Sequence, residues 1–239
     1  MKTKAKPAKK THVTKRSAKT AATPKPSAKA KPSAKAKPRA KAKAKAKPKP
    51  KAKAAPAKQA PRQPPLHLAT DDDCWLVIEA ARARDADDVA AQIIEALGAR
   101  DVADMVRFQQ FVDTRVREAY RWDLWAVAYV MNGGCSDDGF DYFLGWLIGR
   151  GRVRWHAALA NAEAAADGAD PDNEPFESED LLAAASIAYR RKMGEEDVTA
   201  FYARVPAAGA PRGAPAGEPF DENTVGDKYP KLAQRFGMA

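Results

Sequence analysis

The first 65 residues place the strongest limit on the fold, because they contain no acidic residue and no aromatic residue. They carry 23 lysines and arginines, and all five tryptophans, six tyrosines and eight phenylalanines of the 239-residue chain lie after them. A segment of this composition repels itself and buries too little apolar surface to offset the entropy of ordering, so we predict that it is disordered. The remaining 174 residues are long enough to bury an ordinary core by themselves.

The sign of the charge changes at the same place in the sequence. After residue 65 there are 31 acidic residues against 18 lysines and arginines, so a segment of charge −13 follows one of charge +23, and the overall charge of +10 describes neither. We therefore predict three parts: a disordered basic arm at 1–65, a helical domain at 66–205, and a linker with a carboxy-terminal segment at 206–239 that packs back on the domain.

The basic arm alternates lysine, alanine and proline over residues 28–58. Repulsion between the lysines and the missing amide hydrogen of proline favour an extended chain that is partly polyproline II. Such a polycation binds the phosphates of DNA or RNA without sequence preference, since lysine has no planar fork with which to read a base. The most regular part of the alternation supplies seven candidate phosphate-binding residues: Lys41, Lys43, Lys45, Lys47, Lys49, Lys51 and Lys53.

The stretch AKAKAKAKPKPKAK at 40–53 resembles the carboxy-terminal tail of linker histones and the lysine-, alanine- and proline-rich arms of bacterial nucleoid proteins. This resemblance is one of composition, and it implies association with nucleic acid. Two other interpretations stay open. The arm is a spacer or solubilising segment without a ligand, or it is attracted to the acidic domain of its own chain and so competes with phosphate.

The chain after residue 70 has the apolar spacing of helices. One apolar stripe spans about five turns and consists of Met105, Phe108, Val112, Val116 and Tyr120. Ser136 is a typical helix start, and Gly133 and Gly134 are a typical helix end. We predict helices at 71–81, 87–97, 102–120, 122–131, 137–148, 153–165, 179–193 and 195–202. No strand pattern of convincing length occurs, so we predict an all-α fold, a compact domain of about six to eight helices after the basic arm.

The central block at 121–140 reads RWDLWAVAYVMNGGCSDDGF and continues through Phe143 and Trp146 to GRGR at 149–152. Together with Trp75, this block resembles the signature of a bacterial family known as domain of unknown function 4240 (DUF4240). The similarity covers about 72–159, and PAGEPF at 215–220 and YPKL at 229–232 are similar to the family's carboxy-terminal segment. The resemblance implies a compact, mainly helical domain and brings no established activity. The basic arm and the acidic, alanine-rich connection at 161–174 depart from the family pattern.

Two kinds of reactive site are conceivable in this block, and each has a structural alternative. Cys135 precedes a helix, whose dipole lowers a thiol pKa and favours a nucleophile, but no base lies nearby in the sequence and an inert thiol is the alternative. Asp137 and Asp141 are four residues apart and could share a helix face that holds Mg²⁺. The alternative is a capped helix, with Ser136 as the cap and Asp137 and Asp138 in the first turn.

Arginines beside glycines, together with acids at helix starts, suggest a third kind of site. Either the arginines form bidentate pairs with the acids, or one arginine is left free to bind an anion. The residues concerned are Arg121, Asp123, Asp138, Arg150 and Arg152. The tryptophans of the block are expected in the core or, alternatively, along a binding cleft. One candidate pocket therefore combines six residues: Cys135, Asp137, Asp138, Arg150, Arg152 and Trp125.

The signatures of common enzymes are missing from the sequence. HExxH, a spaced Cys/His set, GxGxxG after a strand and GxxxxGK[ST] do not occur, and we expect neither a metal nor a cofactor. Cys74 and Cys135 show no CxxC spacing, and no apolar run is long enough for a membrane span or a secretory signal. We therefore expect the protein to lie in the cytoplasm, where the nucleoid is one location open to it, and to have no membrane partner.

Two functional hypotheses follow from these observations, and whether the protein is an enzyme stays open between them. The leading hypothesis is a non-enzymatic, acidic helical interaction module with an unknown protein partner, kept near nucleic acid by the basic arm. The alternative is an enzyme, or an anion- or metal-binding protein, with a site around 135–138 and Arg150.

Overall fold

The computed structural model describes residues 63–173, 175–194, 196 and 198–238, and these residues fold mainly into helices. Among them no β-strand forms, and the one isolated bridge joins Arg121 to Ala216. The predicted all-α class is therefore confirmed. The prediction of a disordered arm at 1–65 lies outside the described residues, except for 63–65. No described helix is both long enough and apolar enough to cross a membrane.

The described part of the chain contains eleven α-helices and two short 3-10 helices. In chain order they are α1 (Asp71–Arg84), α2 (Val89–Gly98), α3 (Val102–Glu118), α4 (Trp122–Met131), α5 (Asp137–Gly149), α6 (Arg152–Ala160), η1 (Ala162–Ala166), η2 (Pro171–Asn173), α7 (Glu179–Leu182), α8 (Ala184–Met193), α9 (Thr199–Tyr202), α10 (Val225–Lys228) and α11 (Pro230–Arg235).

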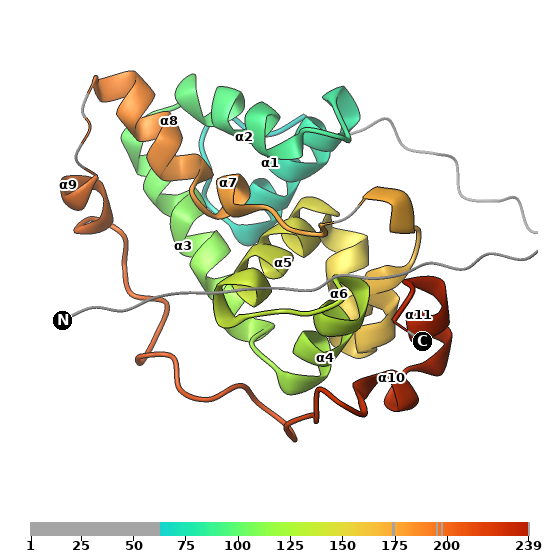
Figure 1. Cartoon of the computed structure of the whole chain (residues 1–239). Coiled ribbons are helices and arrows are strands. Elements are labelled where there is room, and N and C mark those ends of the chain that lie inside the picture. Colours follow the sequence, from blue (N-terminus) through green and yellow to red (C-terminus); the bar gives the residue numbers. More distant parts are fainter. Residues whose placement is uncertain (1–62, 174, 195, 197, 239) are drawn as a thin grey trace, which may run out of the picture. The chain divides into compact units, whose positions relative to one another are not determined.

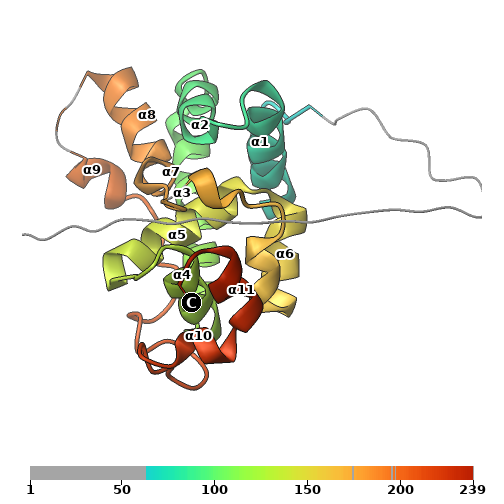
Figure 2. The same ribbon diagram turned by 45° about the vertical axis from the view of Figure 1, so that its right-hand side comes forward.

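Two groups of helices share one hydrophobic core. α2 packs against α1 and α8, and α3 also packs against α8, while α4 packs against α10 and α11. Figures 1 and 2 show α1, α2 and α8 at the top, α4, α10 and α11 at the bottom, and α5 between them. The core between these helices is rich in fully buried rings: Phe108, Phe111, Phe140, Phe143 and Trp155.

Local capping explains where several helices begin. The amide of Asp73 donates to Thr70 Oγ1 at 3.3 Å and the amide of Thr70 donates to Asp73 Oδ2 at 2.8 Å, which makes a capping box at the start of α1. At α5 the amide of Gly139 donates to Ser136 Oγ at 3.1 Å, so the predicted cap is confirmed. Asp101 occupies the cap position of α3, but its side chain accepts no capping hydrogen bond.

The structure divides two segments that the sequence predicts as continuous. The helix expected at 179–193 is two helices, α7 and α8, because the carbonyl of Leu182 accepts a hydrogen bond from Gln109 Nε2 at 3.2 Å, a contact from another helix. The helix expected at 153–165 ends at Ala160, where the Asn161 side chain accepts from the amide of Glu163 at 3.3 Å and starts η1. The division into α7 and α8 adds one α-helix, and α10 and α11 of the carboxy-terminal segment add two more, which explains why the described chain has more helices than the six to eight expected.

A close backbone crossing fixes how α5 meets the chain before α7. The amide of Ser178 donates to the carbonyl of Tyr142 at 2.8 Å, and a Cβ atom added to Gly145 would lie only 2.3 Å from the carbonyl oxygen of Ser178. Glycine is therefore required at 145 for residues 176–182 to lie directly on α5. We call this contact the α5 crossing.

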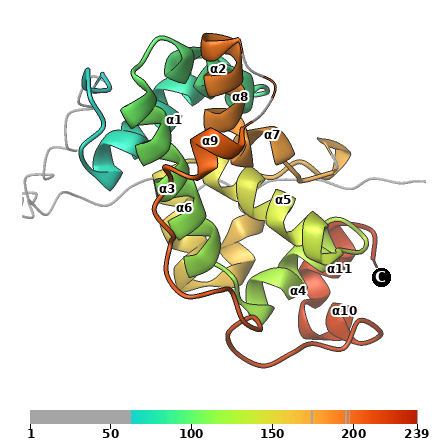
Figure 3. The same ribbon diagram turned by 90° about the vertical axis from the view of Figure 1, so that its left-hand side faces the viewer.

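The chain between α9 and α10 runs alongside α3 and then reaches α4 (Figure 3). We call its residues 206–219 the strap. Arg212 donates to both carboxylate oxygens of Asp141, at 2.6 and 2.8 Å, and its guanidinium lies 4.1 Å from the centre of the Tyr120 ring. Further along, the amide of Ala216 donates to the carbonyl of Tyr120 at 3.0 Å, and the amide of Trp122 donates to the carbonyl of Ala216 at 2.9 Å. These contacts hold the strap against α3, α4 and α5.

The α5 crossing predicts a stability difference between two glycine substitutions. Gly145→Ala should lower the free energy of unfolding by about 1–3 kcal/mol, because the added methyl overpacks the crossing. The matched control is Gly98→Ala at the end of α2, where an added Cβ meets nothing within 4 Å and stability should stay equal or rise slightly. Chemical denaturation measures both variants. Equal free energies of unfolding of the two variants would contradict the close contact between Gly145 and the Ser178 carbonyl.

Candidate functional site

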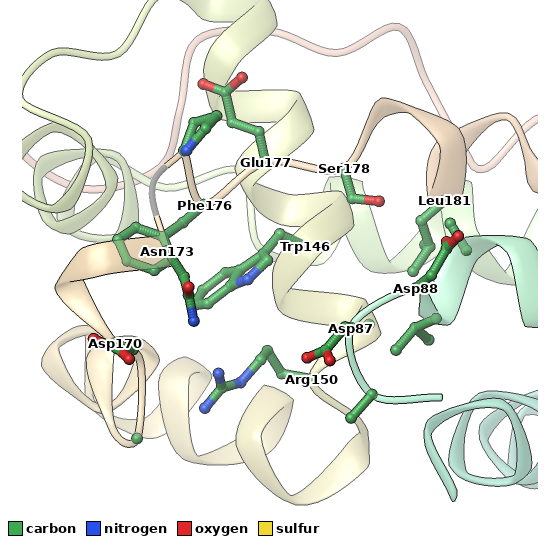
Figure 4. A pocket seen from close by; sticks show the side chains of 16 residues that line it. Asp87, Asp88, Trp146, Arg150, Asp170, Asn173, Phe176, Glu177, Ser178 and Leu181 are labelled. Carbon is green, nitrogen blue, oxygen red and sulfur yellow. The ribbon is translucent and has the colours of Figure 1, made fainter. Parts of the chain in front are cut away.

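A cleft of about 470 Å³ lies beside the α5 crossing, between the start of α2, the end of α5 and the segment at 168–178. Figure 4 shows the side chains around it. We call it the α5 cleft, and its lining includes aromatic, basic and acidic residues: Asp87, Asp88, Trp146, Arg150, Asp170, Asn173, Phe176 and Glu177. It therefore combines an apolar wall with charged groups of both signs, which is typical of a site for a small ligand.

The apolar wall of the α5 cleft is made by Trp146 and Phe176. Their ring centres are 5.2 Å apart with an interplanar angle of 59°. The amide of Phe176 donates to Asn132 Oδ1 at 2.9 Å, and its buried ring also packs edge-on against Phe236 at 5.5 Å. The position of Phe176 is thus fixed through its backbone and its side chain together, so it forms a rigid support for the half-buried Trp146.

Arg150 brings a positive charge into the α5 cleft. Its guanidinium lies 5.2 Å from the centre of the Trp146 ring, and Nη2 donates to the carbonyl of Asp167 at 2.8 Å. Within the described residues it forms no ion pair with a carboxylate. Burial lowers its pKa, and the neighbouring charges of Arg154 and Arg82 lower it further. The cation is therefore held by a carbonyl and a ring, which leaves its charge for an anionic ligand group.

Acidic residues surround the α5 cleft. Asp88 Oδ1 accepts from the amide of Ala91 at 3.1 Å and caps α2, and Asp170 Oδ1 accepts from the amide of Asp172 at 3.2 Å. Figure 4 shows the Glu177 carboxylate directed away from Arg150. The negative charges of these carboxylates repel a polyanion such as DNA and oppose its attraction to Arg150.

The six residues predicted to share one pocket are separated: five lie at or just beyond the two ends of α5, and Trp125 lies on α4. Cys135, Asp137 and Asp138 are at the start of α5, whereas Arg150 and Arg152 are at its end, about 18 Å away at 1.5 Å per residue. Of the six, only Arg150 lines the α5 cleft. The predicted grouping must therefore be corrected, because neighbours along a helical sequence are separated by the length of the helix.

Cys135 does not have the lowered pKa expected of a thiol before a helix. Burial raises its pKa from 9.0 to about 12, and the nearby charge of Glu177 acts in the same direction. Its carbonyl accepts from Trp125 Nε1 at 3.0 Å. Trp125 stacks on Phe140 with ring centres 4.9 Å apart, so this tryptophan belongs to the aromatic packing rather than to the α5 cleft. Of the two alternatives for Cys135, the raised pKa favours the inert thiol over the activated nucleophile.

Of the two alternatives for Asp137 and Asp141, a shared Mg²⁺ site or a capped helix, the contacts favour the capped helix. Asp141 forms the bidentate pair with Arg212 of the strap, so its charge is already neutralised. Among the described residues, no group of three or more His, Cys, Asp or Glu side chains could hold a metal ion. Asp137 and Asp138 lie exposed in the first turn of the capped helix.

Both alternatives expected for the arginines of the central block occur: two of them form ion pairs, and one has no carboxylate partner among the described residues. Arg121 pairs with Asp123, with Nε 3.0 Å from Oδ1, and Arg152 pairs with Asp72 at 2.8 Å. The pKa of Asp123 is lowered although burial alone would raise it, because the hydrogen bonds and charge of Arg121 outweigh burial. Arg150 is the arginine that stays without a carboxylate partner among the described residues.

Comparison with protein families gives a match to the family described as Protein of unknown function (DUF4240), over residues 70–191. This match covers half of the chain. The chain belongs to the DUF4240 family. The matched DUF4240 span includes α1 to α7 and nearly all of α8, so it contains every residue named in the α5 cleft. Comparison with curated proteins and with solved structures gives no significant match.

The family match extends the resemblance seen in the sequence. It continues past residue 159 and includes the acidic connection at 161–174, which forms η1, η2 and one side of the α5 cleft. Residues 1–69 and the strap lie outside the DUF4240 match. Sequence reasoning missed Phe176 and treated Trp146 first as core. The i, i+4 spacing of Trp146 and Arg150 on one helix was the signal that they share a face.

The raised pKa of Cys135 predicts slow alkylation of the folded protein. A rise from 9.0 to about 12 lowers the thiolate fraction near pH 7 about a thousandfold, so iodoacetamide should modify Cys135 far more slowly than an unfolded thiol. The rate should increase about tenfold per pH unit between about pH 7 and 9. Peptide mass spectrometry measures it, with urea-unfolded protein as the control. Equal rates in the two states would contradict the burial of this thiol.

Proposed function

We propose that this DUF4240 protein is a non-enzymatic, two-part molecule of the cytoplasm. Residues 1–65 associate with DNA or RNA without sequence preference, through lysine and phosphate, and the acidic helical part carries a separate binding function. The single observation behind this proposal is the division into a segment of 23 basic and no acidic residues and a segment with 31 acidic against 18 basic residues.

The ion pairs of the folded part support this division of roles. Eight of its fifteen arginines pair with carboxylates of the same chain: Arg82 with Glu79, Arg100 with Asp104, Arg107 with Asp71, Arg115 with Asp71 and Glu118, Arg121 with Asp123, Arg152 with Asp72, Arg154 with Asp167, and Arg212 with Asp141. Since acidic residues also outnumber basic ones there, the helices present no surplus of positive charge to a phosphate backbone. The lysines before residue 66 supply that surplus.

The nucleic-acid proposal predicts a steep and charge-dependent salt effect. Full-length protein in which the seven lysines from Lys41 to Lys53 are replaced by glutamine should bind duplex DNA more weakly. The slope of log affinity against log salt should become shallower by about six, since each lost phosphate contact removes about 0.9. Fluorescence anisotropy at several salt concentrations measures both quantities.

The matched control replaces the same seven lysines by arginine. This variant keeps the charge, so its slope should equal that of the original protein. Equal affinities of the glutamine variant and the original protein at every salt concentration would show that these lysines do not bind DNA.

A second candidate function concerns the α5 cleft, which we propose to hold a small ligand with an aromatic ring and one carboxylate. This proposal is supported by Arg150, which has no ion-pair partner among the described carboxylates and lies over Trp146. The guanidinium would pair with the ligand carboxylate, and Trp146 and Phe176 would contact its ring. This function is independent of residues 1–65.

The cleft proposal predicts that benzoate binds and that its neutral analogue benzamide binds at least about tenfold more weakly, because only benzoate can form a charge-assisted pair with Arg150. Arg150→Gln should weaken benzoate binding by about tenfold or more. Arg191→Gln, an exposed arginine of α8, is the control and should change nothing. Quenching of tryptophan fluorescence reports binding at Trp146. If Arg150→Gln bound benzoate with unchanged affinity, Arg150 would not be part of the ligand site.

A further inference from the structure

A second, larger cavity of about 820 Å³ lies on the other side of the α5 crossing. Its walls come from α3, α5 and α7, and the strap forms its roof. We call it the strap cavity, and the residues that the following argument uses are Gln109, Val112, Asp113, Arg117, Leu182 and Pro211. The strap is attached beside this cavity by the pair between Arg212 and Asp141, both of which line it.

A row of three polar side chains on α3 faces the strap cavity. Gln109, Asp113 and Arg117 are spaced by four residues, so they lie on one face of the helix, in successive turns. On a helix whose apolar stripe faces the core, polar residues such as Asp113 and Arg117 are expected to face the solvent. The structure instead covers them with α7 and the strap, which leaves both side chains only partly exposed.

Gln109 is buried, with 4% of its surface exposed, and one half of its amide is unsatisfied. Nε2 donates to Asp113 Oδ1 at 2.8 Å and to the carbonyl of Leu182 at 3.2 Å. Oε1 is buried and has no hydrogen-bond partner in the described part of the chain. A buried acceptor without a donor is costly, and a ligand N–H group in the adjacent cavity would satisfy it.

Asp113 and Arg117 carry opposite charges, but neither forms an ion pair with a described residue. Burial raises the pKa of Asp113, and this effect exceeds the lowering by Gln109 and by the more distant charge of Arg117. Arg117 Nε is buried without a partner among the described residues. The row therefore presents acceptors at Gln109 and Asp113 and a donor at Arg117.

Apolar side chains complete the strap cavity. Val112 of α3 and Leu182 of α7 form its walls, and Pro211 of the strap lies in its roof. A ligand that satisfies all of these surfaces carries a cationic N–H group at one end, an anionic group about one helical turn away, and an apolar body.

We propose that the strap cavity binds a small zwitterion with an apolar side chain, either a free amino acid or a short peptide with a free amino terminus. The ligand ammonium donates to Gln109 Oε1 and Asp113, the ligand carboxylate pairs with Arg117, and the apolar side chain contacts Val112 and Leu182. The strap closes over the bound ligand. This site is separate from the α5 cleft and from residues 1–65, so it does not depend on the function proposed above.

Isothermal titration of the full-length chain with leucine and with the dipeptide leucyl-alanine tests this proposal. At least one of the two should bind. Tighter binding of leucine would identify a free amino acid as the ligand, and tighter binding of leucyl-alanine would identify a peptide. N-acetyl-leucine lacks the ammonium and leucine amide lacks the carboxylate, so each should bind at least about tenfold more weakly than leucine if leucine is the ligand. If the dipeptide is the ligand, N-acetylated leucyl-alanine and leucyl-alanine amide replace N-acetyl-leucine and leucine amide in this comparison. No binding of either zwitterion at millimolar concentration would overturn the proposal.

Two substitutions assign the ends of the ligand. Asp113→Asn keeps the acceptor for Gln109 Nε2, so it should preserve the fold while it weakens zwitterion binding at least about tenfold. Arg117→Met should weaken binding of the zwitterion to a similar degree but leave the binding of the amidated analogue unchanged. Arg191→Met on α8 is the matched control, and circular dichroism checks that each variant folds.

A second variant keeps the test decisive if Arg117→Met fails to fold. Arg117→Lys retains the charge, and it should bind the zwitterion more tightly than it binds the amidated analogue. Full affinity in both Asp113→Asn and Arg117→Met would show that the ligand lies elsewhere and would overturn the assignment of this cavity. A failed DNA titration leaves these results unaffected, so the two proposals can fail separately.

Discussion

The α5 crossing is the constraint on which the rest of the described structure depends. Only a glycine at 145 lets the carbonyl of Ser178 approach the helix so closely, and this contact directs the chain on both sides of it. Before the crossing, Phe176 reaches Trp146 and forms the wall of the α5 cleft. After it, Leu182 reaches Gln109 and forms the wall of the strap cavity. One backbone contact therefore separates two sites of different chemistry.

Local signals in the sequence were enough to place most helices, because a cap such as Ser136 acts on the backbone three residues away. The break between α7 and α8 could not be predicted in this way, since it depends on Gln109, which is 73 residues distant from Leu182. The candidate pocket failed for a related reason. Residues that are close in the sequence, such as Asp138 and Arg150, are held apart by the helix that joins them.

Charge pairing distinguishes one arginine of the folded part from another, and composition does not reveal it. Arg121 and Arg152 look as available in the sequence as Arg150, but the first two are neutralised by Asp123 and Asp72. Arg117 looked like an ordinary solvent-exposed residue and is instead part of a covered polar row. Asp123 lies only two residues from Arg121 in the sequence, whereas Asp72 reaches Arg152 from another helix and the covered position of Arg117 depends on α7 and the strap.

The roof of the strap cavity lies outside the span that matches the DUF4240 model, whereas its walls lie inside that span. Gln109 and Leu182 belong to the span that matches the DUF4240 family, whereas Pro211 and Arg212 do not. The anchoring pair crosses this boundary, since Asp141 lies inside the span and Arg212 outside it. The strap cavity is thus completed across the boundary of the matched span, because one ion pair ties the fourteen residues 206–219 to the helical frame inside it.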